Sequence, residues 1–306
     1  MDGYFAADSV VVRALSSRAV GLTYGQRALV TGALHARLFV GTAQHTTHRT
    51  SPYTRLGLTA RLFEAVFLGS RAEADRALAY AAKRHATVRG STRVDGGPAH
   101  PTGSSYDAAD PGLMWWTAAF VLDSVEAVHD ALVRRLSDAE REELFTDFVR
   151  WAELFGMPRA GAPRDHRSFR ADFDAWLHSD APFLTDEARL VGRHIAGTSG
   201  YALPLRAISS PVLATVVQGS LDPVVRAHHG ITWGRRQEAA WQAVSRASRA
   251  ASRVPLLRRS PLTTGRSEEF YKVVQRGERA LLARGGVSIR GVSDVPSPYG
   301  EPDHVA

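Results

Sequence analysis

The chain has 306 residues, of which 44% are hydrophobic and 23% are charged. These proportions exclude disordered and fibrous proteins and allow one domain with a large buried core. The sequence contains 0 cysteines, which excludes disulfides, thiolate-bound zinc, iron–sulfur clusters and a cysteine nucleophile. Apart from Lys83 and Lys272, the 38 basic residues are arginines scattered along the chain, so the net charge of +7 indicates no nucleic-acid partner. The densest basic stretch, residues 246–259, lacks interleaved aromatics and is more typical of a solvated helix face than of phosphate binding.

The N-terminus and the apolar runs show no sign of export or of membrane insertion. Asp2 stands where a signal peptide would be basic, and no apolar segment follows it. The longest apolar run, residues 113–122, falls short of the roughly 20 residues that a membrane span needs. We therefore expect a cytoplasmic protein with no stable membrane insertion.

Apolar residues recur at helical spacing through most of the chain, whereas the alternating pattern of a strand is absent. This predicts an all-α protein, a single-domain helical bundle. In chain order, the expected helices are residues 9–38 with a break near Gly21, 55–68, 71–89, 111–132, 137–156, 168–178, 185–196, 209–218, 235–253 and 267–283. The domain is expected to span residues 1–284, and residues 285–306, rich in Gly, Pro and Ser, are expected to form a disordered tail.

The helix that starts at Pro111 is expected to lie in the core. Asp110 suits its N-cap, and the preceding residues 91–109 form a long Gly- and Pro-rich loop of the kind that often serves function. Asp123 falls on the apolar face, where an ionised carboxylate needs a partner, and we favour a structural ion pair with an arginine over a catalytic acid. His129 lies off that face and is expected to be exposed.

No general hydrolase or nucleotide-binding motif occurs, so any chemistry has to come from His, Arg and the acids. The most informative stretches are Arg55-Leu56-Gly57-Leu58-Thr59, Lys83-Arg84-His85-Ala86-Thr87-Val88-Arg89-Gly90 and Tyr106-Asp107-Ala108-Ala109-Asp110-Pro111-Gly112-Leu113-Met114-Trp115-Trp116-Thr117. In this order and spacing they resemble the MpaB-type oxygenases, a family that includes the catalytic domain of latex-clearing rubber oxygenase. The resemblance is close over residues 42–130 and looser up to residues 221–226.

The resemblance implies an all-helical fold that encloses a b-type haem and activates dioxygen or peroxide against a hydrophobic small molecule, such as an alkene or a prenyl chain. It places the iron ligand at His85 and a distal pair at Arg55 and Thr59, which are four residues apart and so share one helical face. Arg84 and Arg89 flank His85, and a cation there is a candidate partner of a haem propionate. Trp116 is either a core residue or part of the haem pocket.

Each of these residues also has an ordinary structural explanation. Taken alone, His85 would be a histidine in the last turn of a helix, Arg55 a surface residue and Thr59 a threonine bonded to its own backbone. His45 and His48 lead into the Arg55 helix, and either is a further candidate for the pocket.

The surrounding residues depart from the rubber-cleaving branch of the family. There, a lysine precedes the threonine and an upstream glutamate is proposed as a base, whereas this chain has Leu58 and Phe39 in those places. We therefore expect no cleavage of polyisoprene. The second hypothesis is a non-catalytic helical protein that binds haem or lipid. A polar Arg55 and Thr59 on the pocket wall would favour catalysis, and a collapsed or apolar pocket would favour binding alone.

Overall fold

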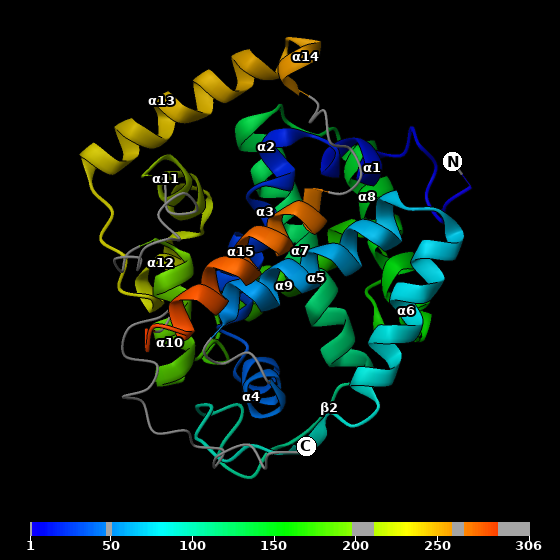
Figure 1. Cartoon of the computed structure of the whole chain (residues 1–306), viewed down its shortest axis with the longest axis vertical. Helices are drawn as coiled ribbons and strands as arrows, with labels where there is room; N and C mark the ends of the chain where they lie inside the picture. Colours follow the sequence, from blue (N-terminus) through cyan, green and yellow to red (C-terminus); the bar gives the residue numbers. More distant parts are fainter. Residues whose placement is uncertain (1, 47–50, 198–210, 259–265, 287–306) are drawn as a thin grey trace.

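The structure is a computed structural model. It describes residues 2–46, 51–197, 211–258 and 266–286, with the backbone alone for residues 258 and 266–270. Its helices are α1 (Val10–Leu15), α2 (Arg18–Gly21), α3 (Tyr24–Gly32), α4 (Ala36–His45), α5 (Pro52–Leu68), α6 (Arg71–His85), α7 (Pro111–Leu132), α8 (Asp138–Leu154), α9 (His166–Leu177), α10 (Asp186–Ile195), α11 (Pro211–Ser220), α12 (Pro223–His228), α13 (Arg235–Ser252), α14 (Pro255–Arg258) and α15 (Arg266–Leu282), shown in Figure 1. A short 3-10 turn covers Arg159–Gly161.

The all-α prediction is confirmed. Within the described residues, the only sheet is an antiparallel pair of three-residue strands, β1 (Arg89–Ser91) and β2 (Ser105–Asp107), with Gly90 opposite Tyr106. None of the helices in these ranges is both long and apolar enough to cross a membrane.

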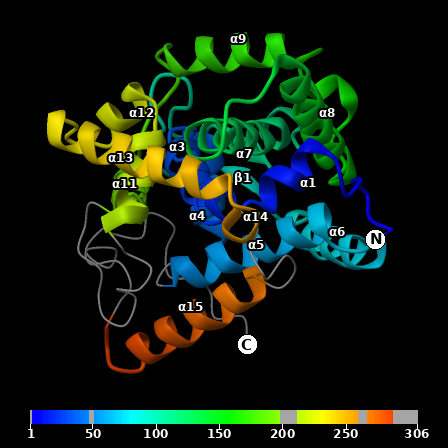
Figure 2. The same ribbon diagram turned by 90° about the horizontal axis from the view of Figure 1, so that it is seen from above.

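Helix α7 is the core helix, as predicted. Asp110 caps it through a hydrogen bond of 3.0 Å from the Leu113 amide to Oδ1, and Pro111 occupies its first turn. The helix packs against α3, α8 and α13, and runs through the middle of the molecule in Figures 1 and 2. Because neighbours cover it on several sides, both its apolar stripe and the residues beside that stripe are buried.

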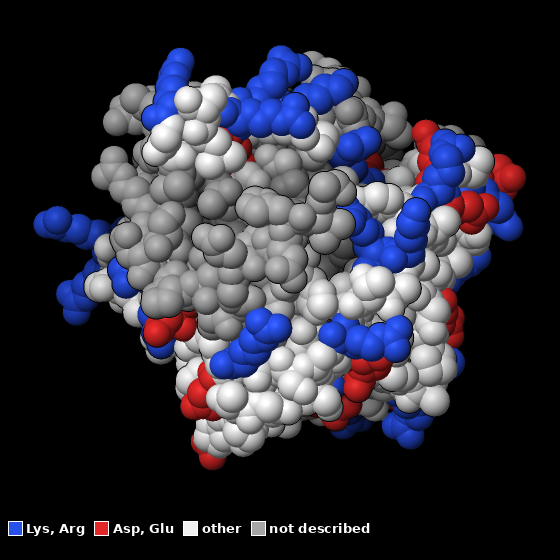
Figure 3. Space-filling model, turned by 60° about the horizontal axis from the view of Figure 1, so that its bottom comes forward, with Lys and Arg blue, Asp and Glu red and all other residues white. Residues whose placement is uncertain are grey.

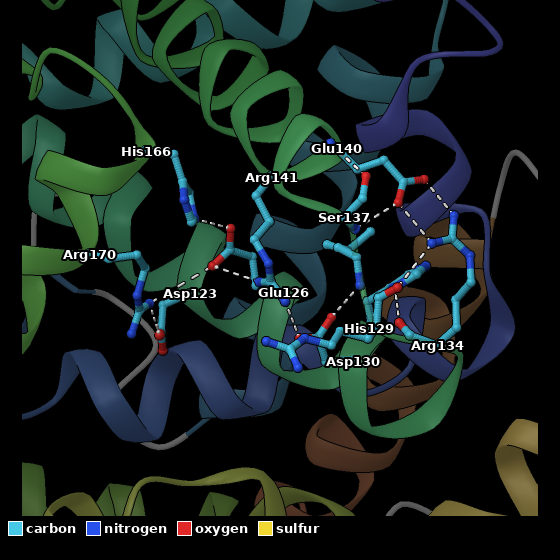
Figure 4. Close-up of polar contacts among 12 residues, drawn as sticks. Asp123, Glu126, His129, Asp130, Arg134, Ser137, Glu140, Arg141, His166 and Arg170 are labelled. Carbon is cyan, nitrogen blue, oxygen red and sulfur yellow. Dashed lines mark hydrogen bonds and ion pairs between the residues drawn. The ribbon is translucent and has the colours of Figure 1, made fainter.

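The buried carboxylates of α7 are paired with arginines (Figure 4). Asp123 accepts hydrogen bonds from Arg27 Nη1 at 2.5 Å and from Arg170 Nη1 at 2.6 Å. Burial alone would raise the pKa of Asp123, but the two guanidinium groups outweigh it and lower that pKa. One turn further, Glu126 bonds His166 Nε2 at 2.6 Å. This geometry confirms the predicted ion pair of Asp123.

The region before residue 46 is more broken than predicted. Residues 9–38 contribute to four helices, because polar residues start a new helix at short intervals. Ser9 caps α1, and His35 Nδ1 accepts a hydrogen bond of 3.4 Å from the Leu38 amide at the start of α4. Helices α12 and α14 are also additional to the prediction.

Two further expectations are wrong. Helix α6 ends at His85 and not near Arg89, since the chain there turns into strand β1 and pairs with β2. His129 is buried and bonds the Arg134 carbonyl through Nδ1 at 2.9 Å, because the side of α7 that carries it is also covered.

The predicted tail begins at residue 285, and its residues 287–306 lie outside the described ranges. On the face shown in Figure 3, Lys and Arg side chains are spread out and do not form a single patch.

Candidate functional site

A cavity of about 1400 Å³ lies among the helices. It is larger than the roughly 300–1,000 Å³ of ordinary small-molecule pockets. Its walls come from α2 to α8, α10, α11, α13, α14 and the segment around β2. Much of the lining is apolar, including Phe39, Leu58, Leu62, Phe63, Met114 and Phe120. The cavity can therefore hold a large hydrophobic molecule, or a cofactor and a substrate together.

Helices α5 and α6 form an antiparallel hairpin that brings Arg55 and His85 to one end of this cavity. The turn between the helices is fixed at Ser70, whose hydroxyl caps α6 while Glu73 bonds back to the Ser70 amide at 2.8 Å. Both Arg55 and His85 line the cavity, and the Arg55 charge acts on the His85 imidazole.

Arg55 is a half-buried cation on the cavity wall. Burial lowers its pKa to about 10, so it stays charged at neutral pH at an energetic cost. Among the described residues, no carboxylate forms an ion pair with Arg55 and none raises its pKa. Because buried charges are normally paired, a guanidinium in this state is suited to an anionic ligand or to negative charge that develops during a reaction.

His85 is the last residue of α6, and its side chain is exposed on the cavity wall. Partial burial and the nearby Arg55 charge lower its pKa below the ordinary 6.5. The imidazole is therefore neutral at pH 7, which is the form that binds a metal. This is opposite to the effect expected of a histidine that serves only the helix dipole, since the dipole favours the charged form.

Thr59 lies one turn after Arg55 on α5 and also lines the cavity, where its side chain is exposed. The predicted distal pair thus shares one face of α5 and one cavity. Leu58 and Phe39 line the same cavity, so the two positions that differ from the rubber-cleaving branch make its wall more apolar.

Tyr106 and His45 form a second polar pair on the wall. His45 Nε2 and Tyr106 Oη are 2.9 Å apart, and both residues line the cavity. Gly41 and Gly90 make room for the tyrosine, because an added Cβ at these positions would lie 3.0 Å from its ring and 2.9 Å from its hydroxyl. The sequence indicated a pocket role for His45 as one alternative but gave no sign of this partner. His48 lies outside the described residues.

Glu278 is a residue that sequence reasoning missed. It is fully buried on α15 and accepts hydrogen bonds from the Tyr53 amide at 3.0 Å, the Thr54 amide at 2.7 Å and the Thr54 hydroxyl at 2.6 Å. These groups belong to the first turn of α5, directly before Arg55. Glu278 lies 225 and 224 positions after the residues that it caps, so no local pattern in the sequence indicates this contact.

The remaining candidates are placed differently. Arg84 lines the cavity beside His85, and its guanidinium also contacts the Tyr80 ring. Arg89 is exposed and donates a hydrogen bond of 2.7 Å to the Ala86 carbonyl, and it is not among the described lining residues. Trp116 is likewise absent from the lining, because it packs into an aromatic cluster with Trp176 at a centroid distance of 4.8 Å.

The residue set fits a cofactor that needs one protein ligand. No group of three or more His, Asp or Glu side chains in the described ranges is arranged to hold a metal ion. A b-type haem supplies its own ring nitrogens and requires one axial imidazole, apolar walls and a cation for its carboxylates. His85, the lining and Arg84 meet these requirements.

The fold and the cavity define a class of helical proteins with a large, mainly apolar cavity whose wall carries an imidazole and a guanidinium. Comparison with known families agrees with this description. The model of the family described as ER-bound oxygenase mpaB/B'/Rubber oxygenase, catalytic domain, matches residues 12–250, and the chain belongs to this family.

Two curated relatives are similar to the chain, each 27% identical over 209 residues, which cover 66% of this chain and 76% of the relative. They are the uncharacterized protein Mb2261 of Mycobacterium bovis and the uncharacterized protein Rv2237 of Mycobacterium tuberculosis. No solved structure matches the chain significantly. Membership in the family supports a general role as an oxygenase.

Proposed function

We propose that this protein is a haem-b-dependent oxygenase or oxidase that acts on a hydrophobic small molecule, with dioxygen or peroxide as the oxidant. In this proposal His85 is the proximal ligand, and Arg55 and Thr59 form the distal face. The observation that supports it most is Arg55, a half-buried cation without an ion-pair partner in the described residues, on the same cavity as a neutral imidazole. The polar pair of Arg55 and Thr59 on the cavity wall also favours catalysis over mere binding of haem or lipid.

Haem, when bound, supplies the activation of dioxygen or peroxide. The residues of the chain supply the metal ligand and the hydrogen-bond donors. His85 offers a ring nitrogen lone pair, because its lowered pKa keeps the imidazole neutral. Arg55 lines the cavity and offers N–H donors that would stabilise negative charge as it develops, and the Thr59 hydroxyl adds a donor one turn away. Arg84, on the cavity wall, would pair with a carboxylate of the cofactor. We assign no role to Arg89 or Trp116.

The apolar walls orient the substrate and exclude water from the reaction. An alkene or a prenyl chain suits such a surface. Polyisoprene is not the proposed substrate, because Leu58 and Phe39 replace the polar residues of the rubber-cleaving branch. A cytoplasmic location, which the sequence led us to expect, remains part of the proposal.

The absorbance spectrum of the purified protein, reconstituted with haemin if necessary, tests the assignment. The wild type should bind haem stoichiometrically and show a Soret band. His85→Ala should lose this binding or show an altered spectrum. His178→Ala is the matched control, since His178 is exposed at the end of another helix and its ring contacts only Asp174 of its own turn. An unchanged spectrum in His85→Ala would rule out His85 as the proximal ligand. A wild type that binds no haem after reconstitution would rule out haem as the cofactor.

A further inference from the structure

We propose that the mouth of the cavity between α2, α11 and α14 docks on the surface of an anionic lipid membrane. The inference goes beyond the proposed chemistry and does not depend on whether the cavity holds haem. It rests on exposed apolar side chains at this mouth and on the charge of the helices around it.

Several large apolar side chains at the mouth are exposed. Leu22, Val212 and Leu257 line the cavity and yet expose 58%, 57% and 48% of their surfaces, which places them at its rim. Beside them, Leu256 is 83% exposed and Val254 is 46% exposed. Scattered exposed leucines are ordinary on protein surfaces, but a group that surrounds one opening indicates a binding surface.

The rim is continuous although its residues lie far apart in the sequence. Helix α14 packs against α2 and follows α13, which in turn packs against α11. Figure 2 shows α13 and α14 across the face of the molecule that is uppermost in Figure 1. The cavity extends from this rim past α3 and α5 to Arg55 and His85. A hydrophobic molecule that enters between α2 and α14 therefore has an apolar path to the candidate site.

The segments that form the rim carry positive charge and no negative charge. Residues 9–45, 211–221 and 239–258 contain no Asp or Glu. Arg18 lines the cavity next to Leu22, and Arg253 precedes Val254; both arginines are exposed and form no ion pair within the described part of the chain. Each basic residue near an anionic bilayer contributes to attraction, and exposed leucines insert shallowly among the head groups.

This combination favours a lipid surface over a second copy of the chain. Two copies that meet at this rim would bring the arginines of both against one another, which like-charge repulsion opposes. A bilayer instead supplies the opposite charge and an apolar layer below it. It is also the reservoir from which a hydrophobic molecule would enter the cavity without crossing water.

Cosedimentation with vesicles tests the proposal. We expect the full-length protein to bind vesicles of phosphatidylcholine mixed with phosphatidylglycerol, to bind pure phosphatidylcholine weakly, and to dissociate as salt is raised. Leu256→Asp/Leu257→Asp should lower the partition coefficient by about ten-fold or more. Arg18→Gln/Arg253→Gln should lower it by about five-fold per arginine, and only on the anionic vesicles.

Matched controls come from surfaces away from the rim. Leu282→Asp changes an exposed leucine at the far end of α15, and Arg236→Gln changes an exposed arginine at the opposite end of α13. Both should bind like the wild type, and circular dichroism should show the same helix content in all variants. The proposal is overturned if the wild type does not bind anionic vesicles or if the leucine variant binds equally well. A dimer in solution that this variant abolishes, without vesicle binding, would also overturn it and identify a second copy as the occupant.

Discussion

Replacing Arg55 by methionine should stabilise the protein without its cofactor while removing its activity. Burial lowers the pKa of Arg55 well below its ordinary value, to about 10, which corresponds to an unfavourable free energy of about 3 kcal/mol for the charged form. This cost is present in full at every pH below about 10 and is relieved only as the pH rises above that value. Methionine fills similar space without charge, so the free energy of unfolding should rise by up to about 3 kcal/mol.

A second buried arginine provides the control. Only 4% of the surface of Arg27 is exposed, and its Nη1 lies 2.5 Å from Asp123 Oδ2. Arg27→Met would leave part of a buried carboxylate charge without its partner, which costs about 3–5 kcal/mol. The two substitutions are chemically the same and should act in opposite directions.

Thermal unfolding of the cofactor-free proteins, followed by circular dichroism at pH 7, measures both effects. At about 2 °C per kcal/mol for a chain of this size, Arg55→Met should raise the melting temperature by up to about 6 °C, and Arg27→Met should lower it by a similar amount or more. Turnover of Arg55→Met should be lost although haem is still bound. If Arg55→Met lowers the melting temperature as Arg27→Met does, Arg55 is a structural residue and the reasoning fails.

Glu278→Ala should lower the free energy of unfolding by about 3–5 kcal/mol in denaturant titrations, because three buried donors lose their acceptor, whereas the exposed neighbour Arg279→Ala should change it little. Burial and the adjacent Glu143 raise the pKa of Asp147 to about 6, so the ionised carboxylate weakens the fold as the pH rises from about 4 to 6. Asp147→Asn should therefore stabilise the protein by up to about 3 kcal/mol at pH 7 and by almost nothing below pH 4, and equal effects at both values would contradict this. Incubation with rubber latex should yield no oligo-isoprenoid aldehydes, and their detection by chromatography would show that Leu58 does not exclude this substrate.

The parts of the fold that were predictable have local causes. Helix α7 begins where Asp110 and Pro111 place its cap, and α8 begins at the capping box of Ser137 and Glu140. The turn of the hairpin that carries Arg55 was also visible, because Gly69 marks the end of α5. Such signals act within one or two helical turns, and the sequence displays them directly.

The parts that were not predictable depend on neighbours distant in the sequence. His129 was expected to face solvent because it lies off the apolar stripe, but α7 is enclosed on more than one side. Glu278 caps α5 by accepting hydrogen bonds from Tyr53 and Thr54, which lie 225 and 224 positions earlier in the chain. The pairing of His45 with Tyr106 likewise requires α4 to meet β2. None of these contacts follows from the periodicity of a single segment.

The hairpin of α5 and α6 has a consequence for how chains of this kind can change in length. Arg55 lies 14 residues before Gly69 and His85 lies 15 residues after Ser70, so they are about 21 Å and about 22 Å along their helices from the turn. One residue inserted into either helix would rotate everything beyond it by about 100° and advance it by about 1.5 Å, turning one of the two side chains away from the other. The turn is also closely packed, since a Cβ on Gly69 would lie 2.5 Å from the Ala65 carbonyl oxygen. The segment between β1 and β2 carries neither Arg55 nor His85, so a change in its length leaves the register of these two residues intact. Insertions and deletions should therefore accumulate at residues 92–104 and be absent between Arg55 and His85.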